Sequence, residues 1–154
     1  MNTRLEFQLF KTIVANTPLI SIDFIITNSE GKALLGQRQN RPAQNFWFVP
    51  GGRIFKDETF ENAFKRISLE ELGKEVILSE STFLGVYEHF YDDNFSGDNF
   101  STHYVVHGYS LNFESHELHL PTIQHNAYQW FDIDNLLADA SVHQYTKNYF
   151  LSRL

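Results

Sequence analysis

The most informative stretch of the chain begins Gly52-Arg53-Ile54-Phe55-Lys56-Asp57-Glu58, continues from Thr59 through Arg66, and ends Glu70-Glu71-Leu72-Gly73. It places a glycine turn before a helix that carries carboxylates. On a helix that advances about 100° per residue, one narrow stripe holds Phe60, Phe64, Ile67 and Glu71, with Ala63 beside it. Glu71 should therefore point toward the core, where an isolated carboxylate needs a partner, a proton or a cation. We predict a metal and diphosphate site here. The pattern alone leaves open an amphipathic helix whose last turn lets Glu71 reach solvent.

The spacing within this stretch resembles the Nudix box, the loop-helix-loop with which hydrolases of nucleoside diphosphate derivatives hold Mg²⁺. Gly52 is followed after five residues by Glu58, after seven more by Arg66, and then by Glu70-Glu71-x-Gly73. Two positions depart from that pattern. Ile67 stands where the box has a glutamate directly after the arginine, so one metal-ligand carboxylate is missing. Lys74 stands where an aliphatic residue usually follows the glycine.

Length and composition favour one enzyme-sized domain over residues 1–154. A chain of 154 residues with 42% hydrophobic content buries roughly 70% of its unfolded surface, so it needs no disulfide. It has no cysteine, which excludes a thiol nucleophile and a zinc-thiolate site. The net charge of -7 argues against nucleic-acid binding. We find no targeting segment and no apolar run of membrane-spanning length, and we expect a cytoplasmic protein without membrane partners.

Hydrophobic periodicity and turn residues predict helices alternating with strands. We expect a first helix over residues 5–16, a strand at 19–27 with a hairpin partner at 33–38, a strand at 46–49, and the box helix at 59–72. Further strands are expected at 83–90, 104–111 and 128–131, followed by helices at 134–138 and 144–154. The fold class is therefore α/β, with a mixed β-sheet sandwiched between α-helices, which is also the Nudix architecture.

Several polar residues lie where a plain sheet protein would not require them. Asp23 interrupts an apolar strand, so it is either solvated or needs its charge satisfied, and the pattern does not decide between the two. Arg38, Arg41 and Arg53 lie in or beside the loops next to the box. Lone arginines are usually solvated, but a guanidinium suits a phosphate, and Arg53 follows two glycines that would let the backbone approach one.

A closer resemblance, over residues 17–150, is to the GDP-mannose mannosyl hydrolases within the Nudix family. It is carried by the loss of the glutamate at Ile67 and by four segments: 40–53 (Asn40-Arg41-Pro42-Ala43-Gln44 to Gly52-Arg53), 89–97, 102–106 and Gln124-His125. The resemblance implies one Mg²⁺ per subunit, with Mn²⁺ as a substitute, held by Gly51, Glu71 and Gln124. It implies His125 as the general base. It assigns diphosphate stabilisation to Arg38, Arg53 and Tyr104, and substrate binding or orientation of the base to Asp23 and His89, with Tyr91 as a further substrate contact.

The function that this resemblance implies is hydrolysis of GDP-mannose to GDP and mannose, with water attacking the anomeric carbon and inverting it, in a homodimer. A histidine whose ordinary pKa is near 6.5 suits the role of base at neutral pH. The alternatives are a pyrophosphohydrolase that releases GMP and a sugar phosphate, a hydrolase that prefers GDP-glucose, and a non-catalytic nucleotide-sugar sensor. The missing glutamate at Ile67 counts against the first, and Gln124-His125 counts against the sensor, which needs no base.

Overall fold

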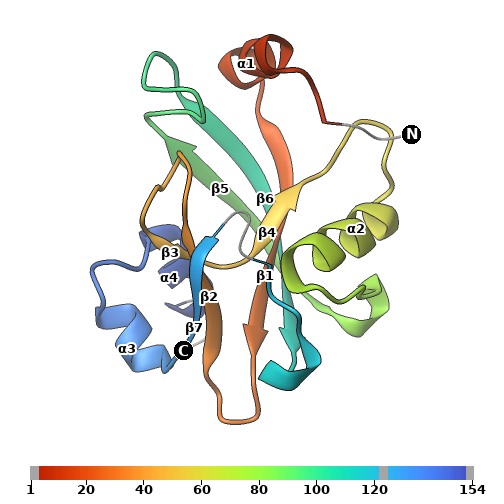
Figure 1. The fold of residues 1–154 in the computed structure, drawn as a ribbon, viewed down its shortest axis with the longest axis vertical. Coiled ribbons are helices and arrows are strands. Elements are labelled where there is room, and N and C mark those ends of the chain that lie inside the picture. Colours follow the sequence, from red (N-terminus) through yellow and green to blue (C-terminus); the bar gives the residue numbers. More distant parts are fainter. Residues whose placement is uncertain (1–3, 122–124, 152–154) are drawn as a thin grey trace.

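The computed structural model describes residues 4–121 and 125–151, and within them the predicted helices and strands occur in the predicted order, with one further strand at Gly51–Arg53 (Figure 1). The helices are α1 (Phe7–Asn16), α2 (Phe60–Leu72), α3 (Ile133–Ala138) and α4 (Gln144–Leu151). The strands are β1 (Leu19–Thr27), β2 (Ala33–Arg38), β3 (Trp47–Phe48), β4 (Gly51–Arg53), β5 (Thr82–Tyr91), β6 (Thr102–Asn112) and β7 (His125–Phe131). Residues 152–154 of the predicted last helix lie outside the described residues.

The strands form one mixed sheet, as predicted. Its order is β3-β2-β1-β6-β5, with β4 paired to β1 and β7 paired to β2. β1 and β6 run parallel over nine registered pairs, from Leu19 opposite Tyr104 to Thr27 opposite Asn112, whereas the other pairings are antiparallel. β5 therefore lies at one edge of the sheet.

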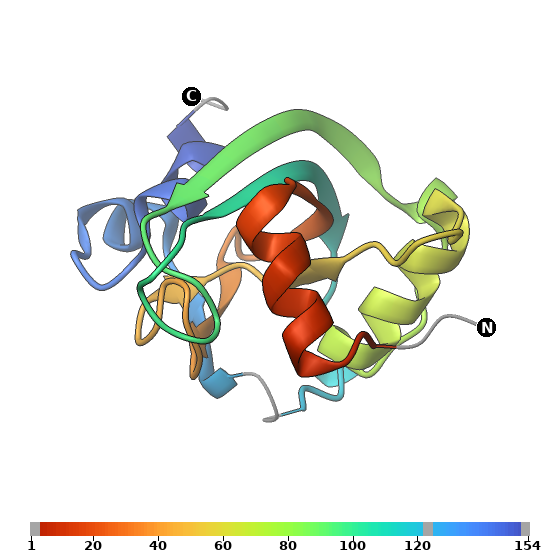
Figure 2. The same cartoon turned by 90° about the horizontal axis from the view of Figure 1, so that it is seen from above.

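β1 separates two hydrophobic cores, which explains why its sequence is apolar on both faces. Ile22, Phe24 and Ile26 pack in the core that contains Phe64 and Ile67 of α2. Ile25 packs in a second core, which receives Leu136 of α3 and Tyr149 and Phe150 of α4. Figures 1 and 2 show α2 and α4 on opposite sides of the sheet, with α1 across the top of Figure 1.

The box helix α2 begins and ends where its sequence predicts. Thr59 caps the first turn, because its side-chain oxygen accepts a hydrogen bond of 3.1 Å from the backbone N–H of Asn62. Gly73 ends the helix in the left-handed conformation at φ 67°. The buried stripe contains Ala63, Phe64, Ile67 and Glu71, as expected. Phe60 is a correction: it is 39% exposed, because at the first helical position it packs on the ring of His107 rather than in the core.

The predicted hairpin of residues 19–27 and 33–38 is wrong in extent. β1 and β2 are registered only at Thr27 and Ala33, beside the turn, and Figure 1 shows the two strands diverging from it. The reason is β4, where we predicted a glycine turn: Gly51–Arg53 pairs with Ser21–Asp23 and occupies the side of β1 where β2 would continue. Two glycines in three residues give β4 no strand signal in the sequence.

Candidate functional site

A cavity of about 510 Å³ opens where β1, β4, β6 and α2 meet the loop after β2. Every predicted site residue whose side chain the structure describes lines it, together with Gly51: Asp23, Arg38, Arg53, Glu71, His89, Tyr91 and Tyr104. Arg41 lines it as well and approaches Asp93 at 3.8 Å. Residues that are up to 81 positions apart in the chain, from Asp23 to Tyr104, thus meet at one place because β1 lies between β4 and β6.

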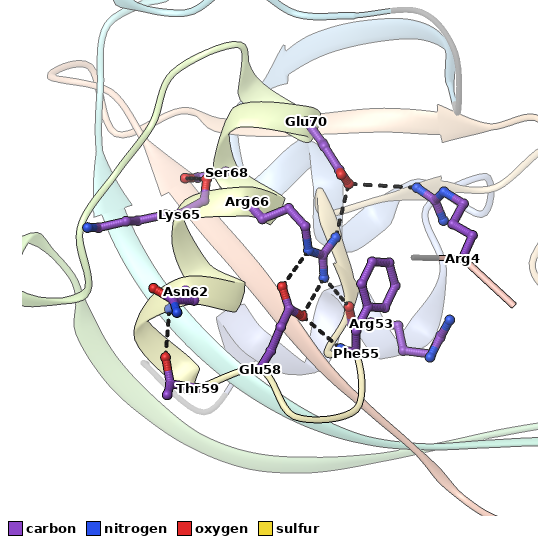
Figure 3. A network of polar contacts seen from close by, with 10 residues as sticks. All are labelled: Arg4, Arg53, Phe55, Glu58, Thr59, Asn62, Lys65, Arg66, Ser68 and Glu70. Atoms are coloured by element: carbon purple, nitrogen blue, oxygen red, sulfur yellow. Dashed lines mark hydrogen bonds and ion pairs between the residues drawn. The ribbon is translucent and has the colours of Figure 1, made fainter. Parts of the chain in front are cut away.

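The side chain of Arg66, on α2, holds the preceding loop against the helix through hydrogen bonds (Figure 3). Its guanidinium donates to Glu58 at 2.7 and 3.0 Å, to the carbonyl of Arg53 at 2.8 Å and to Glu70 at 3.2 Å. Burial alone would raise the pKa of Glu58, but the hydrogen bonds from Arg66 and from the N–H of Phe55 hold it below its ordinary value. The glutamate and arginine of the box therefore shape the loop that carries Arg53.

Glu71 lies at the cavity wall and is 3% exposed, so the predicted inward direction is confirmed. Its carboxylate accepts a hydrogen bond of 3.3 Å from the N–H of Gly51. Gly51 in turn lies against Asp23, since a Cβ on this glycine would come within 2.2 Å of the Asp23 Oδ1. Two carboxylates and a glycine backbone thus border the same space.

This donor set fits a hard divalent cation. Carboxylate and carbonyl oxygens are the ligands that Mg²⁺ takes, and Mg²⁺ usually keeps several waters rather than filling a cage of side chains. Among the side chains that the structure describes, there is no cluster of three or more His, Cys, Asp or Glu that could hold a metal. A cation bound at Glu71 would accordingly have few protein ligands, and its remaining coordination positions would be free for a substrate.

Asp23 is buried rather than solvated, which decides the question that the sequence left open. Burial raises the pKa of Asp23 from 3.8 to about 7, while a hydrogen bond of 2.6 Å from the hydroxyl of Tyr149 and the charge of Arg38 act against that rise. The negative charge of Glu71 adds to it. A nearby cation would offset the negative charges of both Asp23 and Glu71 and lower the pKa of Asp23.

Ile67 occupies the core and not the cavity. It is 1% exposed and belongs to the core that also contains Phe24 of β1 and Phe64 of α2. A Cβ on Gly52 would meet its Cγ2 at 3.0 Å, so the isoleucine lies directly beneath the glycine turn. In this chain, the position that carries a glutamate in the usual box is therefore apolar and buried.

The cationic and hydroxyl groups expected to face the diphosphate are held in place by their neighbours. Arg53 is half-buried beside the rings of Phe10 and Phe55, with its guanidinium carbon 4.9 and 4.8 Å from their centroids. Arg38 donates to the carbonyl of Pro42 at 2.8 Å. Burial raises the pKa of Tyr104, so its phenol keeps its proton and can donate.

His89 is 4% exposed and lies opposite Tyr104 in the register of β5 and β6. Burial, with a smaller contribution from His143, lowers the pKa of His89 to about 4, so its imidazole is neutral near pH 7. Tyr91 lies two residues further along β5 on the same side of the strand, and burial raises the pKa of its phenol, which therefore keeps its proton. This end of the cavity therefore offers uncharged hydrogen-bonding groups.

Two predicted residues fall where little is described. Gln124 lies outside the described residues, and for His125 only the backbone is described. That backbone is the first residue of β7 and is paired with Arg38 of β2, a cavity residue. We predicted this strand at 128–131, whereas β7 begins three residues earlier, at His125.

Sequence reasoning missed the contribution of α4. Tyr149 donates to Asp23, and Tyr145 stacks on His89, so the helix supports two cavity residues from behind. The spacing of four residues predicts that the two tyrosines share a helix face, but nothing in the chain indicates which strand that face meets.

Comparison with known proteins agrees with this architecture. The NUDIX domain family matches residues 17–151. The chain belongs to the Nudix family. Its fold and its hydrolase class are those of Nudix enzymes, which generally use divalent metal cations.

Individual relatives span most of the Nudix chain. The low-salt glycan biosynthesis protein Agl8 of Haloferax volcanii is 40% identical over 130 residues, which cover 84% of this chain and 81% of that protein. A MutT NUDIX hydrolase from Burkholderia pseudomallei is 26% identical, with a TM-score of 0.69 over 88% of this chain and 98% of that one. The NUDIX domain of Shewanella oneidensis NrtR, solved with ADP ribose, shares the fold at 19% identity and a TM-score of 0.65 over 93% and 91% of the two chains. No helix among the described residues is long and apolar enough to cross a membrane.

Proposed function

We propose that this Nudix protein hydrolyses GDP-mannose to GDP and mannose, by attack of water on the anomeric carbon. The observation that carries the proposal is Ile67, which is buried beneath Gly52 where the box usually has a carboxylate. Attack at phosphorus in Nudix pyrophosphohydrolases relies on several box carboxylates that gather metals around water and diphosphate. A helix with a single buried glutamate at the cavity favours a single cation and a different electrophile.

The cation would be held by the carbonyl of Gly51, by Glu71 and by Gln124. Bound there, it would offset the charge of the diphosphate and make GDP a better leaving group. The proximity of the Glu71 carboxylate to the backbone of Gly51, which itself lies against Asp23, supports this assignment for Mg²⁺.

The chain's own residues then bind and orient the reactants. Arg38, Arg53 and Tyr104 donate hydrogen bonds to the diphosphate, whose charge grows as the bond between C1 and the phosphate oxygen breaks. His125 takes the proton of the attacking water on the far face of the sugar, and the electron pair of the broken bond leaves with GDP. Asp23, His89 and Tyr91 contact the substrate or orient the base.

One relative also supports a sugar-related substrate. The Haloferax volcanii protein, 40% identical over most of both chains, is named for glycan biosynthesis. A nucleotide sugar is the class of diphosphate that such a role would involve. We further propose that the protein acts as a cytoplasmic homodimer, for which light scattering should give twice the chain mass of 18.0 kDa.

The experiment that tests the function is a product analysis. Purified protein with Mg²⁺ is incubated with GDP-mannose, GDP-glucose and ADP-ribose, and both products of each reaction are identified by chromatography and mass spectrometry. We expect GDP and free mannose. GMP with a sugar phosphate would indicate the pyrophosphohydrolase instead, preference for GDP-glucose would correct the sugar, and tight binding without turnover would indicate a sensor.

A further inference from the structure

The imidazole of His89 is held among aromatic rings, and one of them is parallel to it. The ring of Tyr145 stacks on it with centroids 4.4 Å apart and an angle of 6° between the planes. Phe48 meets it edge-on at 5.8 Å and 69°. A parallel neighbour restricts rotation of the imidazole about its own side-chain bonds, because any turn out of the plane collides with the phenol ring.

Tyr145 is itself fixed to the strand that carries His89. Its hydroxyl accepts a hydrogen bond of 2.9 Å from the backbone N–H of Phe90 and donates one of 2.8 Å to the carbonyl of the same residue. β5 is an edge strand, and Phe90 is one of its last residues. The phenol therefore takes the place that a neighbouring strand would have and prevents the segment around His89 from shifting along or away from the sheet.

The other end of Tyr145 is anchored in α4 and its neighbours. Its backbone N–H donates to Nδ1 of His143 at 3.1 Å, and its ring lies 4.9 Å from the ring of His143. Tyr91 packs edge-on against it at 5.4 Å and 87°. Tyr145 thus links the start of the last helix to two residues of the cavity wall, Tyr91 and His89.

We propose that Tyr145 is a positioning residue, whose ring stack and paired hydrogen bonds hold the imidazole of His89 in one orientation at the cavity wall. The proposal rests on the proposed function in one respect, which is that His89 serves the hydrolysis of GDP-mannose.

Orientation matters for His89 because its ring is uncharged. A neutral imidazole has one N–H donor and one acceptor nitrogen, so a flip of the ring exchanges the group that a substrate meets. Burial lowers the pKa of His89 to about 4, which leaves no second proton to make both nitrogens donors near pH 7. A wrongly turned ring would therefore present a lone pair where a donor is needed, or the reverse.

Three substitutions separate the parts of this arrangement. Tyr145→Phe removes the two hydrogen bonds and keeps the stack, while Tyr145→Leu removes both. Tyr109→Phe is the matched control, because Tyr109 lies on β6 against Phe64 and Phe83 and does not line the cavity. With GDP-mannose as substrate, we expect kcat/KM to fall roughly tenfold in Tyr145→Phe and about 100-fold in Tyr145→Leu, the order that misplacement of a reacting group costs. Tyr109→Phe should keep its activity.

A double-mutant cycle distinguishes positioning from general support of the fold. If Tyr145 acts through His89, Tyr145→Phe should change kcat/KM little once His89→Gln is already present. Equal losses in both backgrounds would overturn the proposal, because they would mean that Tyr145 supports the cavity without acting on this imidazole.

A second measurement does not depend on turnover. The imidazole signal of His89 is identified in ¹⁵N-labelled protein by its absence from His89→Gln. In the wild type it should be a single sharp signal of a neutral ring, and in Tyr145→Phe it should shift or broaden, whereas Tyr109→Phe should leave it unchanged. An unaltered signal in Tyr145→Phe would contradict the proposal. If GDP-mannose is not hydrolysed, the proposed function fails while the nuclear magnetic resonance result still decides the role of Tyr145.

Discussion

Glu70 and Glu71 are neighbours on α2 with different surroundings, and this difference predicts which of them binds the metal. Glu71 is buried at the cavity beside Gly51, whereas Glu70 forms ion pairs with Arg66 and Arg4 at 3.2 and 3.7 Å near the surface. Glu71→Gln should weaken Mg²⁺ binding and activity far more than Glu70→Gln. Calorimetric titration of both variants with Mg²⁺ measures this. Equal losses, or a larger loss at Glu70, would show that the ligand is misassigned.

Asp23 gives a prediction for stability against pH. Its folded-state pKa of about 7 lies above the ordinary 3.8, so the folded protein holds this proton more tightly than the unfolded chain does. The stability that the proton contributes is present below pH 3.8 and is lost as the pH rises through about 7. In metal-free protein, Asp23→Asn should raise the free energy of unfolding at pH 8, by up to a few kcal/mol at about 1.4 kcal/mol per pKa unit, and change it little at pH 4.

Thermal and urea unfolding at both pH values in the presence of a chelator provide the measurement. Asp57→Asn is the control, since that side chain is 81% exposed. Activity should fall in Asp23→Asn even though the fold is more stable. A variant that is less stable than the wild type at pH 8 would mean that the charged form of Asp23 is favoured in the fold.

His125 is the residue to which the resemblance assigns the base. His125→Gln should fold and bind Mg²⁺ as the wild type does and lose roughly 10²–10⁴-fold in turnover, the usual contribution of a positioned general base. Wild-type turnover should rise with pH across the range in which an imidazole loses its proton. The exposed His116 supplies the control, His116→Gln. Near-normal turnover in His125→Gln, with an unchanged pH profile, would remove His125 from the mechanism.

Among the elements, α2 and the loop before it depend on one arginine. The carboxylate of Glu58 is 3% exposed and receives two hydrogen bonds from Arg66. Arg66→Ala leaves this charge buried without its partner, which typically costs about 3–5 kcal/mol. Lys65→Ala on the same helix should stay within about 0.5 kcal/mol, because Figure 3 shows Lys65 pointing away from the network. Urea unfolding of the two variants compares them, and a similar small cost for both would contradict the role given to Arg66.

The elements that sequence predicted well are those whose signal is local. The ends of α2 follow from a capping threonine and a stop glycine, and β1 follows from a long β-branched run. β4 could not be predicted, because three residues with two glycines form a strand only when β1 offers them a partner. The hairpin failed for the same reason, since competition between β2 and β4 for one edge of β1 is a property of the sheet.

At the scale of the whole molecule, the site is assembled from segments that the sequence keeps far apart. The inward direction of Glu71 follows from helical period alone, whereas Arg38, Tyr104 and His89 were assigned by resemblance and are found at one cavity. The contacts that α4 makes with the site were not predicted. Tyr149 reaches Asp23 because of the way the last helix packs on the sheet, and no sequence motif indicates that packing. Local periodicity thus predicts the box, and tertiary packing decides what surrounds it.

Hydrolysis of GDP-mannose in ¹⁸O-labelled water distinguishes attack of water on carbon from attack on phosphorus. Mass spectrometry of both products at early times, with mannose alone in labelled water as the control for exchange, locates the label. We predict label in the released mannose and none in GDP, with the inverted anomer seen by nuclear magnetic resonance before mutarotation. Label in GDP would indicate attack at the β-phosphorus, and label in GMP or in a sugar phosphate would indicate an ordinary Nudix pyrophosphohydrolase. Either result would contradict attack at carbon.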